Sequence, residues 1–219
     1  MGTPHPNDEH WMRHALNLAW KGQYSTTPNP RVGCVFVRDG VAIAEGFHVR
    51  AGEGHAEVQA IAQAHAQGVS LQGSTAYVTL EPCAHHGRTG PCAEALVATG
   101  VTRVVAAVLD PNPLVAGKGM AILQAAGIAT ESGVLLEQAR WINRGFFSRM
   151  ERALPWVRMK VAASLDGQTA LQNGQSQWIT GPEARADGHA WRARACAVHP
   201  SQPRLAKFVV SRAARRPQL

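Results

Sequence analysis

Three potential metal ligands and one carboxylate, confined to two short runs, constrain this chain more than any other feature. His55 and Glu57 lie in the first run, and Cys83 and Cys92 lie in the second. One imidazole and two thiolates can hold a zinc ion and leave its fourth position open for water. A carboxylate that is not a ligand can then move protons for that water. A chain that uses these groups together must bring both runs to one place.

The order of the helix and strand patterns predicts an α/β domain around these runs. Asp8 is a suitable N-cap for a first helix that stops at Gly22, and the Asp39-Gly40 dipeptide suits a two-residue hairpin turn. The alternation of later segments indicates a mixed sheet covered by helices on both faces. The expected helices are 8–22, 55–67, 91–98, 118–126 and 135–149, and the expected strands are 32–37, 41–47, 75–80, 103–109 and 128–131.

Beyond a boundary near residues 152–155, the patterns change. Residues 156–164 predict one more strand, and residues 182–198 predict one more helix. One strand and one helix do not complete an independent α/β domain.

The net charge of +7 is unevenly distributed along the chain. Residues 1–150 carry 11 basic and 11 acidic side chains, whereas residues 198–219 carry five basic side chains and no acidic one. The basic character therefore belongs to the C-terminal end and not to the two runs. Only one aromatic side chain, Phe208, lies among those basic residues, fewer than the series of stacking residues typical of nucleic-acid binding, which argues against a nucleic-acid partner.

The sequence lacks the features that mark membrane-spanning and secreted proteins. No apolar run is long enough to span a membrane, and the N-terminus has neither the basic start nor the apolar core of a secretory signal. Four cysteines in 219 residues do not form a disulfide framework. We expect a cytoplasmic protein with reduced thiols and no membrane partner, and the sequence leaves a homo-oligomer open.

The predicted helices and strands place the four residues at positions that suit their chemistry. His55, Glu57 and Cys92 fall at helix N-termini, and Cys83 follows a strand. The partial positive charge of a helix N-terminus lowers the pKa of a thiol and favours the thiolate. Taken singly, each cysteine could instead be an ordinary buried thiol, which is the reading we adopt for Cys34 in the middle of a strand.

Several runs resemble the bifunctional riboflavin-biosynthesis deaminase–reductase family. The layout of the four residues also matches the H-x-E and P-C-x-x-C signature of zinc nucleobase deaminases, except that eight residues separate the cysteines. The long spacing, filled by a His-His-Gly-Arg-Thr loop, is the family's own variant, whereas cytidine and tRNA-adenosine deaminases keep the short one. The matching runs are 28–33, 46–48, 54–57, 79–89, 91–92 and 110–113.

This resemblance implies a zinc-dependent deaminase with a cytidine-deaminase-like three-layer α/β/α fold at residues 1–150. The implied reaction is hydrolytic deamination of 2,5-diamino-6-(5-phosphoribosylamino)pyrimidin-4(3H)-one to 5-amino-6-(5-phosphoribosylamino)uracil. The implied Zn²⁺ ligands are His55, Cys83 and Cys92, with Glu57 as the catalytic residue. Asn29 and His48 would contact the pyrimidine or ribose, and His85 and Arg88 the phosphate. Taken alone, Asn29 suits a turn between prolines, and His85 and Arg88 suit a solvated loop.

Residues 151–198 resemble the start of the family's reductase domain, a dihydrofolate-reductase-like α/β fold that uses NADPH. By this resemblance, Ala162 and Trp178 would contact NADPH, and Ser176 and Arg192 would contact the substrate. Without it, strand packing, a core position, a helix cap and a helix-face charge would explain these four residues. Residues 199–219 form a basic, Pro/Arg-rich tail that departs from the family. We therefore expect an incomplete dihydrofolate-reductase-like segment, from a truncated or frameshifted reading frame, without reductase activity.

Two other functions stay open at this stage. One is a nucleoside or tRNA-base deaminase, and the other is a non-enzymatic zinc-binding module whose basic tail contacts a partner. The inserted loop between Cys83 and Cys92 and the balanced charge of residues 1–150 favour a phosphoribosylated pyrimidine as the small-molecule substrate.

Overall fold

A computed structural model describes residues 5–85, 90–113 and 115–198 of the chain. The chain divides into two units, Met1–Trp156 and Val157–Leu219, and each is described by itself. The division suggested by the sequence, at residues 150 and 198, stays a prediction.

A five-stranded mixed sheet lies at the centre of the first unit, in the order β2-β1-β3-β4-β5. Strand β1 is antiparallel to both of its neighbours, and β3, β4 and β5 are parallel. Asp39 and Gly40, which join β1 to β2, both have positive φ angles, of 53° and 72°, as a primed hairpin turn requires. The strands are β1 (Gly33–Arg38), β2 (Val41–Phe47), β3 (Thr75–Val78), β4 (Arg103–Ala106) and β5 (Ala129–Ser132).

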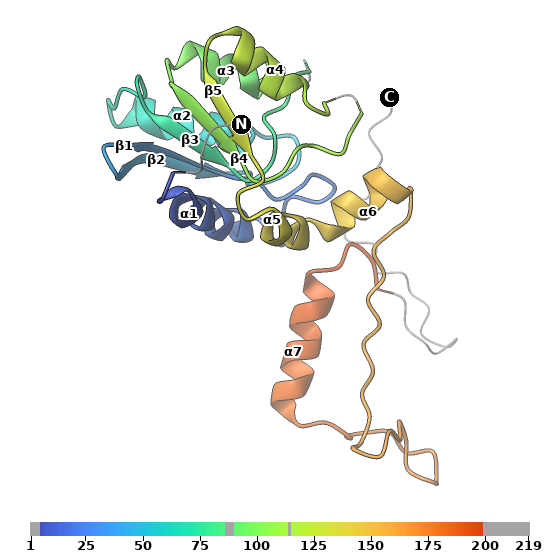
Figure 1. Cartoon of the computed structure of the whole chain (residues 1–219). Coiled ribbons are helices and arrows are strands. Elements are labelled where there is room, and N and C mark those ends of the chain that lie inside the picture. The colour runs from blue at the N-terminus through green and yellow to red at the C-terminus, as the bar shows by residue number, and fades with distance from the viewer. Residues whose placement is uncertain (1–4, 86–89, 114, 199–219) are drawn as a thin grey trace. The chain divides into compact units, whose positions relative to one another are not determined.

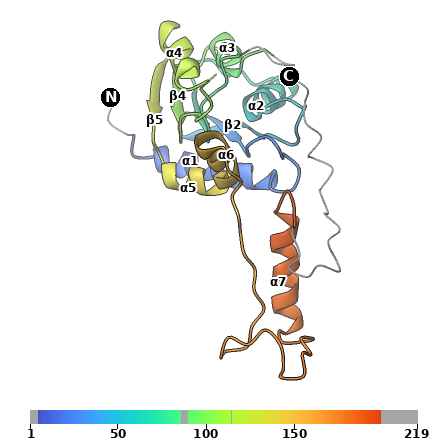
Figure 2. The ribbon, with the colours of Figure 1, turned by 90° about the vertical axis from the view of Figure 1, so that its right-hand side faces the viewer.

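Helices cover both faces of this sheet, so the predicted three-layer α/β/α arrangement is confirmed (Figures 1 and 2). One face is covered by α1 (Asp8–Lys21) and α5 (Leu136–Ile142). The other is covered by α2 (Ala56–Ala66), α3 (Cys92–Ala98) and α4 (Lys118–Ala125). The elements from α1 to β5 differ from their predicted bounds by only a few residues.

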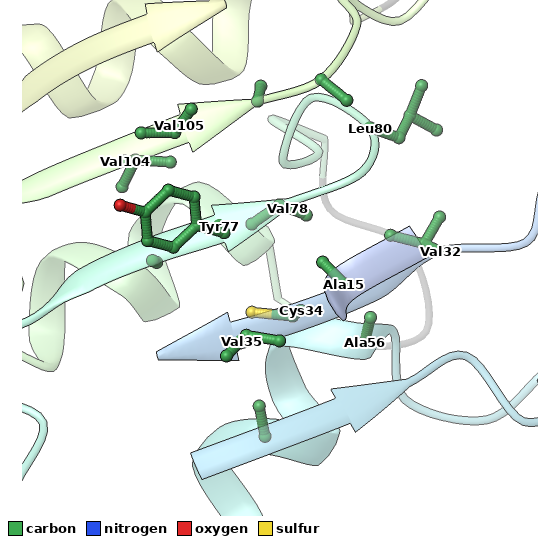
Figure 3. Packing of buried hydrophobic residues seen from close by; sticks show 14 of the residues in the cluster. Ala15, Val32, Cys34, Val35, Ala56, Tyr77, Val78, Leu80, Val104 and Val105 are labelled. Atoms are coloured by element: carbon green, nitrogen blue, oxygen red, sulfur yellow. The ribbon is translucent and has the colours of Figure 1, made fainter. Parts of the chain in front are cut away.

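The core follows from this double coverage. A strand that is buried on both faces is apolar at successive positions instead of alternating ones, and Cys34, Val35 and Phe36 of β1 are all fully buried. Figure 3 shows Ala15 of α1 and Ala56 of α2 beside β1. Cys34 is therefore a core residue, as expected.

Two strand glycines allow the helices to lie directly on the sheet. A Cβ atom at Gly33 would lie 2.0 Å from the Ala15 carbonyl oxygen of α1, and one at Gly46 would lie 2.5 Å from the Ala60 nitrogen of α2. Both neighbours are backbone atoms of helices, so neither can move alone. The two residues belong to paired strands and face opposite layers.

The predicted helix at 135–149 is wrong in one respect, because it is two helices, α5 and α6 (Arg144–Arg152), that meet at Asn143. The side chain of Asn143 accepts a hydrogen bond from the Arg31 N–H and donates one to the Arg31 carbonyl, each at 2.8 Å. A tertiary contact with the loop before β1 thus sets the position of the break.

The predicted strand at 156–164 is also wrong. In the second unit the described residues contain one helix, α7 (Pro182–Ala193), which ends earlier than expected, and no strand. Residues 157–163 are extended beside α7, with Arg158 stacked 3.9 Å from the Trp191 ring centroid, while Val157 and Met159 are 80% and 85% exposed. A strand needs hydrogen-bonded neighbours, and the described residues supply none here.

Among the described residues, every helix is too short or too polar to cross a bilayer.

The glycine contacts generate a stability prediction. Gly33→Ala should lower the free energy of unfolding by about 3 kcal/mol, because α1 must move away from β1. Gly145→Ala is the matched control, since Gly145 lies in α6 with open space around its Cα and an ordinary φ. That substitution should raise stability by about 0.5–1 kcal/mol through helix propensity. Urea unfolding monitored by circular dichroism compares the two, and equal stabilities would contradict the close-packing argument.

Candidate metal centre

The first run of site residues is placed by the start of α2. His55 is the N-cap residue, with an extended backbone (φ −68°, ψ 172°), and Glu57 lies in the first turn. The close contact of Gly46 with Ala56 and Ala60 fixes α2 against β2. Both side chains therefore lie at the edge of the sheet where β1 begins and β2 ends.

The second run reaches the same edge from two elements. Cys83 follows the carboxyl end of β3, and Cys92 is the first residue of α3. The Cys92 N–H donates to the Cys83 sulfur at 3.3 Å, and the Ala93 N–H donates to the Cys83 carbonyl at 3.1 Å. One free N–H group of the helix N-terminus, that of Cys92, thus points at the Cys83 sulfur atom, which favours its thiolate form.

These elements bring the three predicted ligands together. The His55 Nδ1 atom lies 3.6 Å from the Cys83 Sγ atom and 3.4 Å from the Cys92 Sγ atom. The three ligand atoms all lie within 4.8 Å of one another. One imidazole and two sulfurs at this separation can surround a single cation, and this soft donor set suits zinc.

The electrostatics of the two thiols agree with a cation site. Hydrogen bonding from Cys92, aided by His55, lowers the pKa of Cys83 to about 4. The same contact with Cys83, together with burial, raises the pKa of Cys92. Cys83 is thus the more acidic thiol of the two, and a bound dication would hold both as thiolates.

Glu57 lies behind the ligands and has an unusual environment for a carboxylate. It is only 3% exposed, and its Oε2 atom has no hydrogen-bond partner among the described residues. Burial raises the pKa of Glu57 to about 7. A carboxylate with such a pKa can both accept and return a proton near neutral pH. The unpaired oxygen fits a site in which a water or a substrate supplies the partner.

Asn29 and His48 lie beside the three ligands. The His48 Nδ1 atom lies 3.1 Å from the Gly54 carbonyl oxygen, and its Nε2 atom lies 3.1 Å from Asn29 Nδ2. The His48 ring is perpendicular to that of His55, with centroids 5.4 Å apart. Burial lowers the pKa of His48, which favours the neutral ring.

Six predicted site residues remain, two in the segment between the cysteines and four in the second unit. His85 is exposed, two residues after Cys83, and Arg88 lies outside the described residues. Ala162, Ser176, Trp178 and Arg192 belong to the second unit, where Trp178 stacks with Arg185 and Arg192 contacts His189. The roles suggested for these residues stay predictions.

Glu81 shapes the loops around the site. Its buried carboxylate accepts hydrogen bonds from four backbone N–H groups, at 2.9 to 3.4 Å, those of Asp110, Gly117, Gly119 and Met120. The N-cap position of α4 is Gly117, which has no side-chain oxygen. Glu81 therefore caps α4 from a distant part of the chain, a role that sequence spacing does not reveal.

A cavity of about 980 Å³ lies at the opposite edge of the sheet. Its lining includes Thr75, Arg103 and Ala129, the first residues of the three parallel strands. Arg103 in this lining pairs with Asp8 and Glu131. The chemistry-bearing residues instead gather at the edge that holds His55.

Two family models match this sequence. The "cytidine and deoxycytidylate deaminase zinc-binding region" matches residues 5–108, and the "RibD C-terminal domain" matches residues 155–199. The first match contains His55, Glu57, Cys83 and Cys92.

Individual proteins match over most of the chain. The riboflavin biosynthesis protein RibD of Escherichia coli K12 is 53% identical over 191 residues, and that of Haemophilus influenzae is 55% identical over 188 residues. These matches cover 87% and 86% of this chain. The chain spans about half the length of these relatives, 51% and 50%.

Two solved structures of similar proteins have the same fold over most of this chain. RibD of Acinetobacter baumannii has a TM-score of 0.81 at 56% identity, over 87% of this chain and 52% of the other. A diaminohydroxyphosphoribosylaminopyrimidine deaminase/5-amino-6-(5-phosphoribosylamino)uracil reductase of Thermotoga maritima has a TM-score of 0.81 at 42% identity, over 84% and 52%. With its mixed sheet and His/Cys/Cys cluster, the first unit has the cytidine-deaminase-like fold, and over its matched residues the chain is similar to the RibD proteins of riboflavin biosynthesis.

Proposed function

We propose that the first unit is a zinc-dependent hydrolytic deaminase of riboflavin biosynthesis. The observation that carries the proposal is a buried carboxylate with an unpaired oxygen, Glu57, beside an imidazole and two thiols that can hold one cation. Similarity to the RibD proteins supports the pathway.

The proposed substrate is 2,5-diamino-6-(5-phosphoribosylamino)pyrimidin-4(3H)-one, which would be converted to 5-amino-6-(5-phosphoribosylamino)uracil and ammonia. The name of the Thermotoga maritima relative, which contains the corresponding deaminase activity, supports this choice. The long segment between Cys83 and Cys92 also supports it, because His85 and Arg88 could there bind the substrate phosphate.

The reaction requires water activation and proton transfer. A zinc ion held by His55, Cys83 and Cys92 would acidify a water and bring its pKa to about 7. Glu57 would accept the proton that this water loses as it attacks the amidine carbon of the pyrimidine. Glu57 would then return the proton to the ring nitrogen and assist the departure of ammonia. Its buried position keeps its pKa close to 7, which suits both steps.

The proposal also covers the cellular location and the residues of the second unit. Thiolate ligands require a reducing compartment, which supports a cytoplasmic location. In the second unit, Ala162 and Trp178 would contact NADPH and Ser176 and Arg192 a reductase substrate, since the RibD C-terminal domain matches residues 155–199.

A direct assay tests the proposed activity. Full-length zinc-loaded protein should release ammonia from the diaminopyrimidine phosphate with a spectral change of the pyrimidine. Cytidine and adenosine-containing tRNA should be poor substrates. Faster turnover of cytidine or tRNA would favour the nucleoside or tRNA-base deaminase, and an absence of turnover with all three would overturn the proposal.

Glu57→Gln tests the proton-transfer role. The amide cannot accept the proton, so kcat should fall by about 10²- to 10⁴-fold, while zinc content by atomic absorption stays near that of the unmodified protein. Glu9→Gln, at an exposed position on α1, is the control and should keep full activity. Loss of zinc from the Glu57 variant would show that the carboxylate serves as a ligand or structural group instead.

The assignment of the zinc ligands is tested by measuring zinc affinity, without an activity assay. Cys83→Ser replaces a soft thiolate with a weakly acidic hydroxyl, and zinc affinity should fall by about 100-fold or more because one ligand of three is lost. Cys196→Ser, at an exposed position in the second unit, should bind zinc normally. Equal affinities in a chelator competition would be incompatible with Cys83 as a ligand.

A further inference from the structure

His48 offers no free hydrogen-bonding atom to a substrate. It is 2% exposed, and both ring nitrogens have partners within the protein. A side chain in this condition can influence a reaction only through the groups that it holds.

The tautomer of His48 follows from the chemistry of its partners. The Gly54 carbonyl oxygen, 3.1 Å from Nδ1, can only accept, so the Nδ1 atom carries the hydrogen. In the neutral ring the Nε2 atom is then an acceptor. Its partner at 3.1 Å, the Asn29 carboxamide, must therefore present its NH₂ group.

This bond fixes which way the Asn29 amide points. With Nδ2 on His48, the Oδ1 atom is turned away from the ring, and no described residue hydrogen-bonds to it. The Asn29 backbone is held separately, because its N–H donates to the Thr26 carbonyl at 2.8 Å. Asn143 clamps the backbone of Arg31, two residues further on.

The position of this pair relates it to the metal centre. The His48 ring meets the His55 ring edge-on, with centroids 5.4 Å apart, so His48 lies between the ligand and Asn29. His48 thus links the proposed ligand His55 to the amide of Asn29. A fixed acceptor at that place selects for an N–H or O–H group on the substrate.

We propose that His48 is a positioning residue, which acts by holding Asn29 so that its Oδ1 atom accepts a hydrogen bond from the substrate. This rests on the proposed deaminase function, and it differs from the sequence-based expectation that His48 itself contacts the pyrimidine or ribose. The role requires the Nδ1–H tautomer and a ring that shares no hydrogen bond with the substrate.

Two variants of His48 distinguish the role of its acceptor atom, Nε2, from that of its donor atom, Nδ1. The amide of His48→Asn can still donate to the Gly54 carbonyl but has no atom at the position of Nε2. The longer His48→Gln can place its oxygen near Asn29 Nδ2. We expect kcat/KM to fall about 10- to 100-fold in His48→Asn, mainly through KM, and by less than about threefold in His48→Gln. Zinc content should be unchanged in both.

Asn29→Asp tests the other half of the pair, since its carboxylate cannot donate to Nε2. It should lose about as much kcat/KM as His48→Asn, and the double variant should be no worse than the worse single one, because both remove the same interaction. Additive losses, or equal losses in His48→Gln and His48→Asn, would overturn the proposal. His65→Asn, at an exposed histidine of α2, is the control for the histidine substitution and should behave as the unmodified protein.

Nuclear magnetic resonance of ¹⁵N-histidine-labelled, zinc-loaded full-length protein supplies a readout that needs no turnover. His48, assigned by comparison with His48→Gln, should show a protonated Nδ1 and an unprotonated Nε2. A protonated Nε2 would overturn the inference even if every variant folded poorly. If the unmodified protein showed this tautomer but did not deaminate the pyrimidine, the proposed function would fail and the geometry of His48 would stand.

Discussion

The close approach of α1 and α2 to the sheet is the contact on which the arrangement of the first unit depends. It is possible only because Gly33 and Gly46 have no side chains where the helix backbones pass. The contact at Gly46 has a direct chemical consequence. Gly46 lies two residues before His48, and α2 begins one residue after His55. Fixing β2 against α2 therefore fixes the two imidazole rings against each other.

A second anchor brings the sulfur ligands to the same place. The Glu81 N–H continues the parallel ladder by donating to the Val108 carbonyl at 2.9 Å, while its carboxylate caps α4. Gly119 lies so close to the Pro82 carbonyl that a Cβ atom there would be 1.9 Å away. The chain thus has little freedom between β3 and Cys83. The ligand's position is set by buried charge-assisted hydrogen bonds to backbone N–H groups, which are stronger than neutral ones.

Local signals made much of this unit predictable from sequence, and non-local contacts account for what was missed. Helix starts, the hairpin turn and the placement of His55, Glu57 and Cys92 at helix N-termini depend on nearby residues. The break at Asn143 depends on Arg31, which is 112 residues away, so no pattern around it could reveal it. The predicted strand at 156–164 failed for a related reason. Apolar alternation shows which residues suit a sheet, but it does not supply the neighbouring strand.

The hydrogen bonds of buried polar atoms distinguish the roles of the site residues. The family resemblance suggested that both Glu57 and His48 act on the substrate. A buried polar atom without a partner costs about 1–3 kcal/mol, and Glu57 Oε2 is such an atom. The fold can tolerate this free-energy cost at a site where a bound water or substrate supplies the missing hydrogen bond. His48, equally buried, has both nitrogens satisfied by the protein. A group in that condition organises the site, whereas an unsatisfied one is available to react.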